Sequence, residues 1–204
     1  MCGRYYIDIN INEINKIMAE AEKNIYENAK AGEVFPSDIA PIYIKKGKII
    51  KLILAKWGFP KWKGNGLIIN ARSESIEKKV MFKSLIHNNR CIIPASAYFE
   101  WKENNYKKHK EKYKIEKPGS ILYFAGLYNV FPRCKTKQIS LFDTNDFDIC
   151  YTIITRDACS SISHIHDRMP LIIDKHKTSE WMGGKNIDEV LDYNLTFNCK
   201  AVKV

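Results

Sequence analysis

Hydrophobic side chains near the start of the chain recur at helical spacing. They are Ile14, Ile17, Met18, Ala21 and Ile25. Residues three or four positions apart lie on one face of an α-helix, so this set predicts an amphipathic helix. Asn12 can cap its start and Gly32 can terminate it. The pattern predicts a helix from about residue 13 to about residue 30.

Short β-rich runs dominate the rest of the chain. Residues 41–44 and 48–54 flank Lys46 and Gly47 and predict a β-hairpin. Further predicted strands cover residues 67–69, 90–93, 98–101, 112–115, 121–124 and 150–154. Shorter helical patterns cover residues 76–87, 156–162, 174–182 and 187–192, and the polar stretch 133–148 predicts a loop or an insertion. Strands outnumber helices without a regular strand–helix alternation, which favours an α+β fold.

Length and composition limit the class of protein. The chain has 204 residues, which predicts a single domain over residues 1–204. Hydrophobic residues make up 45% and charged residues 27%, so a disordered tail or a coiled coil is excluded. No apolar run approaches the roughly 18 residues of a membrane span, and the first residues lack the apolar region of a signal peptide. We therefore expect a cytoplasmic protein without a membrane partner.

The net charge adds a candidate partner. Lysine and arginine total 33 against 23 acidic residues, a formal charge of +10. A basic surface favours a polyanion such as nucleic acid, through phosphate neutralisation and counterion release. The charge alone leaves a second interpretation open, because lysine runs such as residues 107–110 are also typical of a solvated hairpin tip.

Of six cysteines, Cys2 is distinguished by its position. The chain has no C-x-x-C pair, so neither a zinc knuckle nor a thioredoxin-like motif is present. Removal of Met1 would leave Cys2 with a free α-amine beside its thiol, with reference pKa values of about 8 and about 8.5. Such a residue can condense with an aldehyde through an imine to a thiazolidine, or attack an amide as an N-terminal nucleophile. A cysteine at this position by chance is the alternative.

Three further polar residues stand among apolar or small neighbours. Asn70 directly follows a predicted strand, and the alternative to a role in the site is that it caps the next helix. Glu100 lies between Phe99 and Trp101, where burial would raise its pKa, unless it points outward from its strand. His166 can titrate near neutrality. His164 and His166 could share a metal ion, but no third ligand is evident, so we predict neither a metal nor a cofactor.

Four motifs in series carry a resemblance to a known family. They are Met1-Cys2-Gly3-Arg4-Tyr5, Asn70-Ala71-Arg72-Ser73-Glu74, Phe99-Glu100-Trp101 and His166-Asp167-Arg168-Met169-Pro170. Together with supporting segments at residues 36–38, 57–62, 90–95 and 152–155, they resemble the SRAP family (SOS response-associated peptidase) over nearly the whole chain. The resemblance implies a single α+β domain with a mainly antiparallel sheet or open-barrel core and flanking helices.

The same resemblance implies a function in DNA damage. A family member would recognise abasic sites in single-stranded DNA and form a covalent crosslink through the N-terminal cysteine. By motif, Cys2 would be the nucleophile, Asn70 would position it, and Glu100 and His166 would transfer protons. Self-processing peptidase and abasic-site lyase activities are also implied, and we expect a monomer that associates with the nucleoid when bound to DNA.

Residues beside these motifs are candidates for holding the DNA strand. Arg4, Arg72 and Arg168 would contact phosphates, whereas Pro36, Trp57 and Trp62 would wedge or stack against bases, and Thr155 belongs to a family-like segment. The alternatives are a core position for either tryptophan and a structural ion pair for any of the arginines. The Phe82-Lys83 pair departs from the family, because many relatives have arginine after the phenylalanine.

Two other classes of function remain open from the residues alone. The first is an N-terminal-cysteine amidotransferase or related hydrolase, which shares the Met-Cys-Gly start but has no need of such a basic surface. The second is a non-catalytic single-strand binding module, in which Cys2 is incidental. Substitution of Cys2 separates the second class from a crosslinking enzyme.

Overall fold

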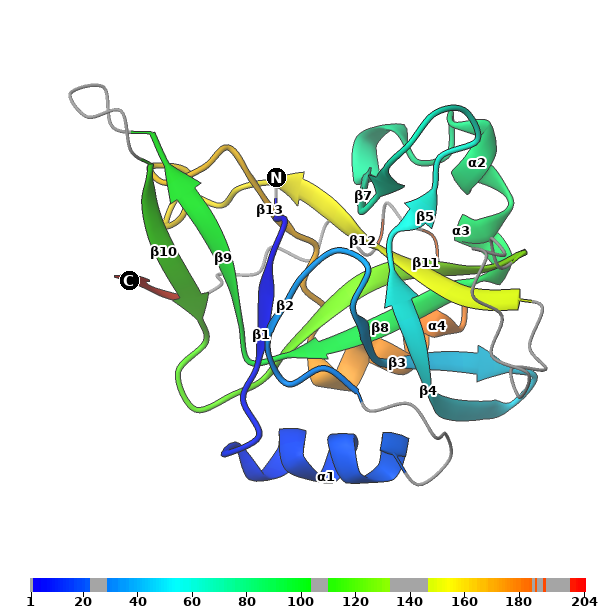
Figure 1. Ribbon diagram of the computed structural model, residues 1–204, viewed down its shortest axis with the longest axis horizontal. Coiled ribbons are helices and arrows are strands. Elements are labelled where there is room, and N and C mark those ends of the chain that lie inside the picture. Colours follow the sequence, from blue (N-terminus) through cyan, green and yellow to red (C-terminus); the bar gives the residue numbers. More distant parts are fainter. Residues whose placement is uncertain are drawn as a thin grey trace.

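A computed structural model describes most of the chain. It covers residues 2–22, 29–103, 110–132, 147–184, 186, 189 and 199–204. Most described elements are strands, arranged as a barrel with a second sheet beside it and short helices around them (Figure 1). No helix within these ranges is long and apolar enough to cross a membrane.

Five strands form a closed barrel. They are β3 (Ile39–Lys46), β4 (Ile49–Trp57), β8 (Arg90–Ala95), β11 (Leu122–Pro132) and β12 (Phe147–Asp157). The pairing runs from β11 through β8, β3 and β4 to β12, and β12 pairs again with β11. All of these pairs are antiparallel except β4 with β12, so the predicted α+β class with a mainly antiparallel barrel core is confirmed.

Strand β12 also carries two short strands that bring distant segments to one end of the barrel. The strand β13 (Arg168–Pro170) pairs with it antiparallel, and β7 (Asn70–Arg72) pairs with it parallel, with Ile153 opposite Asn70. Residues near 70, 155 and 168 therefore meet at the C-terminal end of β12.

The second sheet lies against the barrel. It consists of β2 (Gly32–Val34), β1 (Tyr5–Ile7), β9 (Ala97–Lys102), β10 (Glu111–Glu116) and β14 (Lys200–Lys203), paired antiparallel with β1, β9 and β10 in the middle. Only Ser96 separates β8 from β9, so the chain passes directly from the barrel into this sheet. A separate two-stranded sheet consists of β5 (Phe59–Pro60) and β6 (Leu67–Ile68).

The helices are short and peripheral. Figure 1 shows α1 (Asn12–Glu22) across one end of the molecule and α2 (Val80–Lys83) with α3 (Leu85–Asn88) at another corner. Among the elements of the described ranges, α4 (Thr178–Met182) is a further short helix, and single 3-10 turns cover Ser73–Ser75 and Lys175–Lys177. Helix α1 buries Ile14, Ile17, Met18 and Ala21, the stripe that the sequence predicts.

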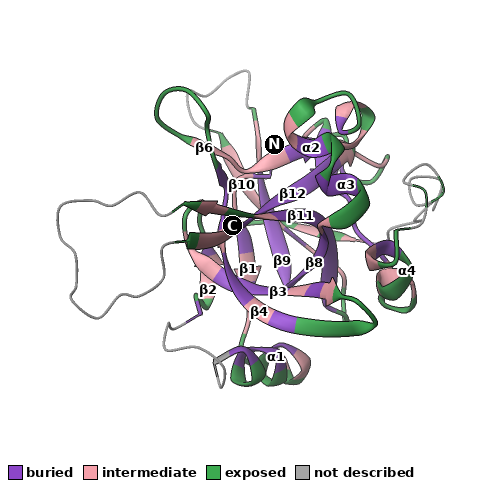
Figure 2. Ribbon diagram, turned by 90° about the vertical axis from the view of Figure 1, so that its right-hand side faces the viewer, coloured by how far each residue is buried: buried purple, intermediate pink, exposed green. Residues whose placement is uncertain are grey.

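The core lies inside the barrel and between it and the second sheet. Every residue of β8 is buried, as expected of a strand covered on both faces, and Figure 2 shows buried residues gathered on β8, β9, β11 and β12. Packing here is tight at Gly126, where a Cβ atom would lie 2.4 Å from Cδ1 of Ile93 and 2.8 Å from the carbonyl oxygen of Thr152. Only glycine lets β11 approach its neighbours this closely.

Two predicted helices differ from the structure. The first does not reach residue 30, because the amide of Lys30 donates to the carbonyl of Ile39 and joins the chain to β3; residues 23–28 lie outside the described part. No helix covers residues 156–162, because β12 continues to Asp157 and turns follow. The β3–β4 hairpin and the strands predicted from 67 to 154 are confirmed, whereas residues 133–146 and most of 187–192 lie outside the described ranges.

Candidate active site

The four predicted catalytic residues come from four separate segments and meet at one place. Cys2 precedes β1, Asn70 begins β7, Glu100 lies in β9, and His166 lies between β12 and β13. Nδ2 of Asn70 donates to the carbonyl oxygen of Cys2 at 2.9 Å, and Nε2 of His166 lies 3.8 Å from Oε2 of Glu100. The negative charge of Glu100 also raises the pKa of the Cys2 thiol. The structure therefore brings the four residues together, and their catalytic roles stay predictions.

Strand register explains how Cys2 reaches Glu100. Tyr5 pairs with Tyr98 across β1 and β9, and the amide of Phe99 donates to the carbonyl of Arg4 at 2.9 Å. Because the strands are antiparallel, residues that precede Tyr5 continue alongside residues that follow Tyr98. The chain start is thereby directed along β9 toward Glu100.

Glu100 is the most perturbed acid of the site. Its side chain is buried, with 1% of the residue exposed, and burial raises its pKa from 4.5 to about 7. Removal from water disfavours the charged carboxylate, which is the physical cause of the shift. A carboxyl group with this pKa can both donate and accept a proton near neutrality, as general acid–base catalysis requires.

The Cys2 thiol is held in its neutral form. It is completely buried, and burial raises its pKa, with the charge of Glu100 raising it further. Its Sγ donates a hydrogen bond to the carbonyl oxygen of Arg4 at 3.6 Å. A buried thiol of this kind becomes a good nucleophile only when a base removes its proton, and Glu100 is a carboxyl group whose charge reaches the thiol.

The imidazole of His166 is oriented by its backbone. The amide of Arg168 donates to Nδ1 at 3.0 Å, and Oδ1 of Asp167 lies 2.9 Å from the same nitrogen. These contacts favour opposite tautomers, because an amide needs an acceptor and a carboxylate needs a donor. The backbone amide cannot turn away, whereas Asp167 is 86% exposed, so the geometry favours the neutral tautomer with its proton on Nε2, the nitrogen that lies nearer Glu100. Burial lowers the pKa of His166, which favours this neutral form.

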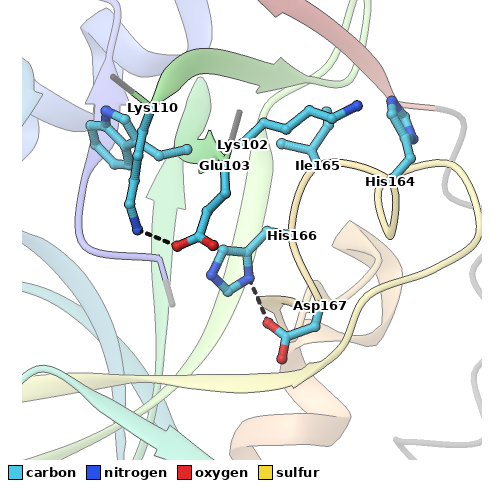
Figure 3. A pocket seen from close by; sticks show the side chains of 8 residues that line it. Lys102, Glu103, Lys110, His164, Ile165, His166 and Asp167 are labelled. Carbon is cyan, nitrogen blue, oxygen red and sulfur yellow. Dashed lines mark hydrogen bonds and ion pairs between the residues drawn. The ribbon is translucent and has the colours of Figure 1, made fainter. Parts of the chain in front are cut away.

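A cleft opens beside His166. It has a volume of about 370 Å³, and its lining residues are Trp101, Lys102, Glu103, Lys110, His164, Ile165, His166 and Asp167. Figure 3 shows the His166 ring close to Glu103, which pairs with Lys110 at 2.8 Å. The cleft makes His166 reachable from solvent, whereas Glu100 lies behind it in the protein. Within the described ranges, no three His, Cys, Asp or Glu side chains are grouped to hold a metal ion.

The two tryptophans predicted to contact DNA differ in exposure. Trp57 as a stacking residue is wrong: it is fully buried, its Nε1 donates to the carbonyl of Ile69 at 3.0 Å, and its ring stacks on Tyr151. Trp57 is instead a core residue, which is the alternative that the sequence left open. Trp62, by contrast, is 92% exposed between β5 and β6, where its ring is open to a ligand.

The three arginines have different surroundings. Arg72 is exposed at the end of β7. Arg168 is almost buried, pairs with Asp157 and with Glu74 at 2.9 Å, and donates to the carbonyl of Thr155. The structural ion pair thus holds for Arg168, and any contact of its guanidinium with phosphate stays a prediction. Arg4 pairs with Glu33 at 3.1 Å.

Pro36 and Thr155 also lie near the site. Pro36 is half-buried in the turn between β2 and β3, where the preceding Phe35 is 40% exposed. Thr155 is fully buried at the end of β12, and its Oγ1 has no hydrogen-bond partner among the described residues. Contacts of both residues with DNA stay predictions.

Sequence reasoning missed the residues that support Arg4. Its guanidinium lies 4.1 Å from the ring centre of Phe35 and 5.2 Å from that of Trp101, between two aromatic faces. Glu33 then joins Arg4 to Lys112 of strand β10. These contacts join residues from four separate segments of the chain, so no local sequence pattern predicts them.

Comparisons with known proteins show the family to which the chain belongs. The family model for SOS response associated peptidase (SRAP) matches residues 1–203. Abasic site processing protein YoqW of Bacillus subtilis is 33% identical over 200 residues, which cover 92% of this chain and 83% of that protein. Abasic site processing protein YedK of Escherichia coli is 27% identical, with 93% and 85% covered. A crystal structure of a protein from Bacteroides thetaiotaomicron has the same fold, with a TM-score of 0.75 at 22% identity over 100% of this chain and 92% of that one. The chain belongs to the SRAP family.

Proposed function

We propose that this protein processes abasic sites in single-stranded DNA by forming a covalent thiazolidine with Cys2, once Met1 has been removed. The names of the relatives support abasic-site processing, and the grouping of Cys2, Asn70, Glu100 and His166 supports the chemistry. The observation that carries the proposal is the buried Glu100, whose pKa of about 7 lets it exchange protons beside the Cys2 thiol.

The reaction begins with opening of the sugar. An abasic sugar is mostly a closed hemiacetal, so its ring oxygen needs a proton before the C1′ aldehyde is released. Protonated His166 supplies that proton from Nε2, and the C1′ hydroxyl gives its own proton to solvent as the ring C–O bond breaks and the aldehyde forms. The cleft makes the imidazole reachable for this step.

Closure of the thiazolidine follows at Cys2. The α-amine attacks the aldehyde carbon to give a carbinolamine, which loses one water and becomes an imine. The thiol then adds to the imine carbon, its proton passes to a base, and the imine nitrogen gains a proton. Glu100 serves these steps: as a carboxylate it takes the thiol proton, and as an acid it protonates the leaving hydroxyl.

Asn70 fixes the nucleophile during these steps. Its amide holds the Cys2 carbonyl at 2.9 Å, so the amine and the thiol of Cys2 keep one orientation toward the incoming carbon. Orientation of this kind supplies a large part of catalysis when two groups must attack the same atom in order.

Single-strand binding rests on the surface around the site. Arg72 is an exposed cation at the end of β7 and would contact a flanking phosphate, and the exposed Trp62 would stack on a base. The imine intermediate also acidifies the neighbouring C2′ position, so abasic-site lyase activity would arise from the same adduct. Self-processing would be the step that releases Met1.

Intact mass spectrometry tests the proposal. Wild-type protein incubated with an abasic single-stranded oligonucleotide should lose Met1 and gain the mass of the oligonucleotide minus one water. Cys2→Ala should form no heat-stable adduct yet keep most of its non-covalent binding, whereas the matched variant Cys159→Ser should react like wild type. A stable adduct in Cys2→Ala would refute the mechanism.

A further inference from the structure

Two half-buried cysteines, Cys159 and Cys199, both contact Ser161. Sγ of Cys159 lies 3.1 Å from Oγ of Ser161, and Sγ of Cys199 lies 3.4 Å from the same oxygen. Both cysteines are free thiols, and each side chain lies close enough to Ser161 for a hydrogen bond to the same oxygen. We propose that Cys159 and Cys199 form a site of reversible oxidation, at which a hydroperoxide converts the two thiols into an intramolecular disulfide.

The first cysteine begins the loop that carries His166. Cys159 follows the end of β12, and its carbonyl oxygen accepts from the amide of Ile162 at 2.9 Å. The carbonyl of Ile162 accepts in turn from the amide of His166 at 3.2 Å. Two hydrogen bonds therefore connect the backbone of Cys159 to the backbone of His166.

The second cysteine belongs to a different part of the fold. Cys199 directly precedes β14, which pairs with β10, and β10 pairs with the strand β9 that holds Glu100. Figure 3 shows the red ribbon of β14 close to the loop with His164, as the contact of Ser161 with Cys199 requires. A disulfide here would join the His166 loop covalently to the sheet of Glu100.

The surroundings distinguish this pair from the other described cysteines. Cys91 and Cys150 are buried in barrel strands, where a thiol is inert. Cys159 and Cys199 are both partly exposed, so a small oxidant can reach them. Burial raises the pKa of Cys199, but the hydrogen bond with Ser161 acts against it by favouring the thiolate.

The oxidation balances with one hydroperoxide. One thiolate attacks the peroxide oxygen, which gives a sulfenic acid and releases water from hydrogen peroxide. The second thiolate then attacks the sulfenic sulfur, the S–S bond forms, and a second water leaves. Two thiols are oxidised, one peroxide is reduced to two waters, and a dithiol reductant reverses the change.

Peptide mapping of the full-length protein tests the site. After treatment with hydrogen peroxide in slight excess, the intact mass should fall by two hydrogen atoms, and a tryptic digest should contain the Cys159 peptide linked to the Cys199 peptide. Dithiothreitol should restore the original mass. The melting temperature should be higher in the oxidised protein, because the bond restricts the unfolded chain between the two positions.

Serine variants provide the controls. Cys159→Ser and Cys199→Ser should each lose the linked peptide and the rise in melting temperature, whereas the matched variant Cys150→Ser should keep both. The wild-type map stands without the variants if either of them fails to fold. Linkage of either cysteine to Cys134 or Cys2, oxidation beyond the sulfenic acid, or no linked peptide would overturn the proposal. None of these results depends on crosslinking to DNA, so the proposed function can stand or fall separately.

Discussion

Replacement of Glu100 by glutamine should remove a pH dependence from the stability of the protein. The pKa of Glu100 is about 7 in the folded protein and 4.5 where the group is solvated. The folded state therefore holds this proton more tightly than the unfolded state does. The stability that comes from the neutral carboxyl is fully present below about pH 4.5 and is lost as the pH rises through 7.

The size of the effect follows from the two pKa values. At about 1.4 kcal/mol per unit of pKa, the difference between 4.5 and about 7 corresponds to about 3 kcal/mol. The side chain is 2% exposed, so solvent screening reduces this figure little. Glutamine has nearly the same shape as glutamate and does not ionise. The cost of burying it therefore does not change with pH.

Urea denaturation from pH 4.5 to pH 8 measures the effect. The difference in unfolding free energy between Glu100→Gln and wild type should shift in favour of the variant by about 3 kcal/mol across this range. Glu77→Gln is the matched control, because Glu77 is exposed and its variant should follow wild type throughout. Parallel curves for Glu100→Gln and wild type would refute the assignment of a raised pKa to this residue.

Three further outcomes are expected. His166→Ala should slow crosslinking while its affinity for DNA stays near wild type. A pre-opened aldehyde substrate should restore much of the single-turnover rate of His166→Ala but not that of Glu100→Gln. Equal rescue of both variants would contradict the division of roles. Arg72→Ala should reduce the salt dependence of single-strand binding by about 0.7 in log K against log salt, whereas Trp62→Ala should weaken binding with the slope unchanged; filter binding at several salt concentrations decides. Gly126→Ala should lower the unfolding free energy by about 1–3 kcal/mol, because its Cβ would meet Ile93 and a backbone oxygen, and an unchanged urea midpoint would contradict this.

Local patterns in the sequence predict most of the strands and the burial of Glu100, but not the ends of every helix. The alternation on both sides of Lys46 and Gly47 gives the β3–β4 hairpin, and the acid between Phe99 and Trp101 is buried as its neighbours suggest. Glu100 and His166 were brought together by the family motifs, and the 3.8 Å between them follows only from the fold.

Other features depend on contacts that no local pattern contains. Trp57 and Trp62 are five positions apart in one motif, yet one lies in the core and the other on the surface, because β4 ends in the barrel and β5 leads out of it. The ion pairs of Arg168 join residues 74, 157 and 168. The parallel pairing of β12 with β4 and β7 also joins segments far apart in the sequence, so no local pattern predicts it.

The closed barrel also sets the order in which the protein can fold. The strands β4 and β12, residues 49–57 and 147–157, are neighbours in space but far apart along the chain, so the loop between them must close late and slowly. Because β7 and β13 pair with β12, the segments that hold Asn70 and His166 have no sheet to join until then. During synthesis Cys2 and Glu100 leave the ribosome before β12, and their strands β1 and β9 pair without it. The segments of Asn70 and His166 reach their places only after β12 has docked, so the group of four residues is completed only when the barrel closes.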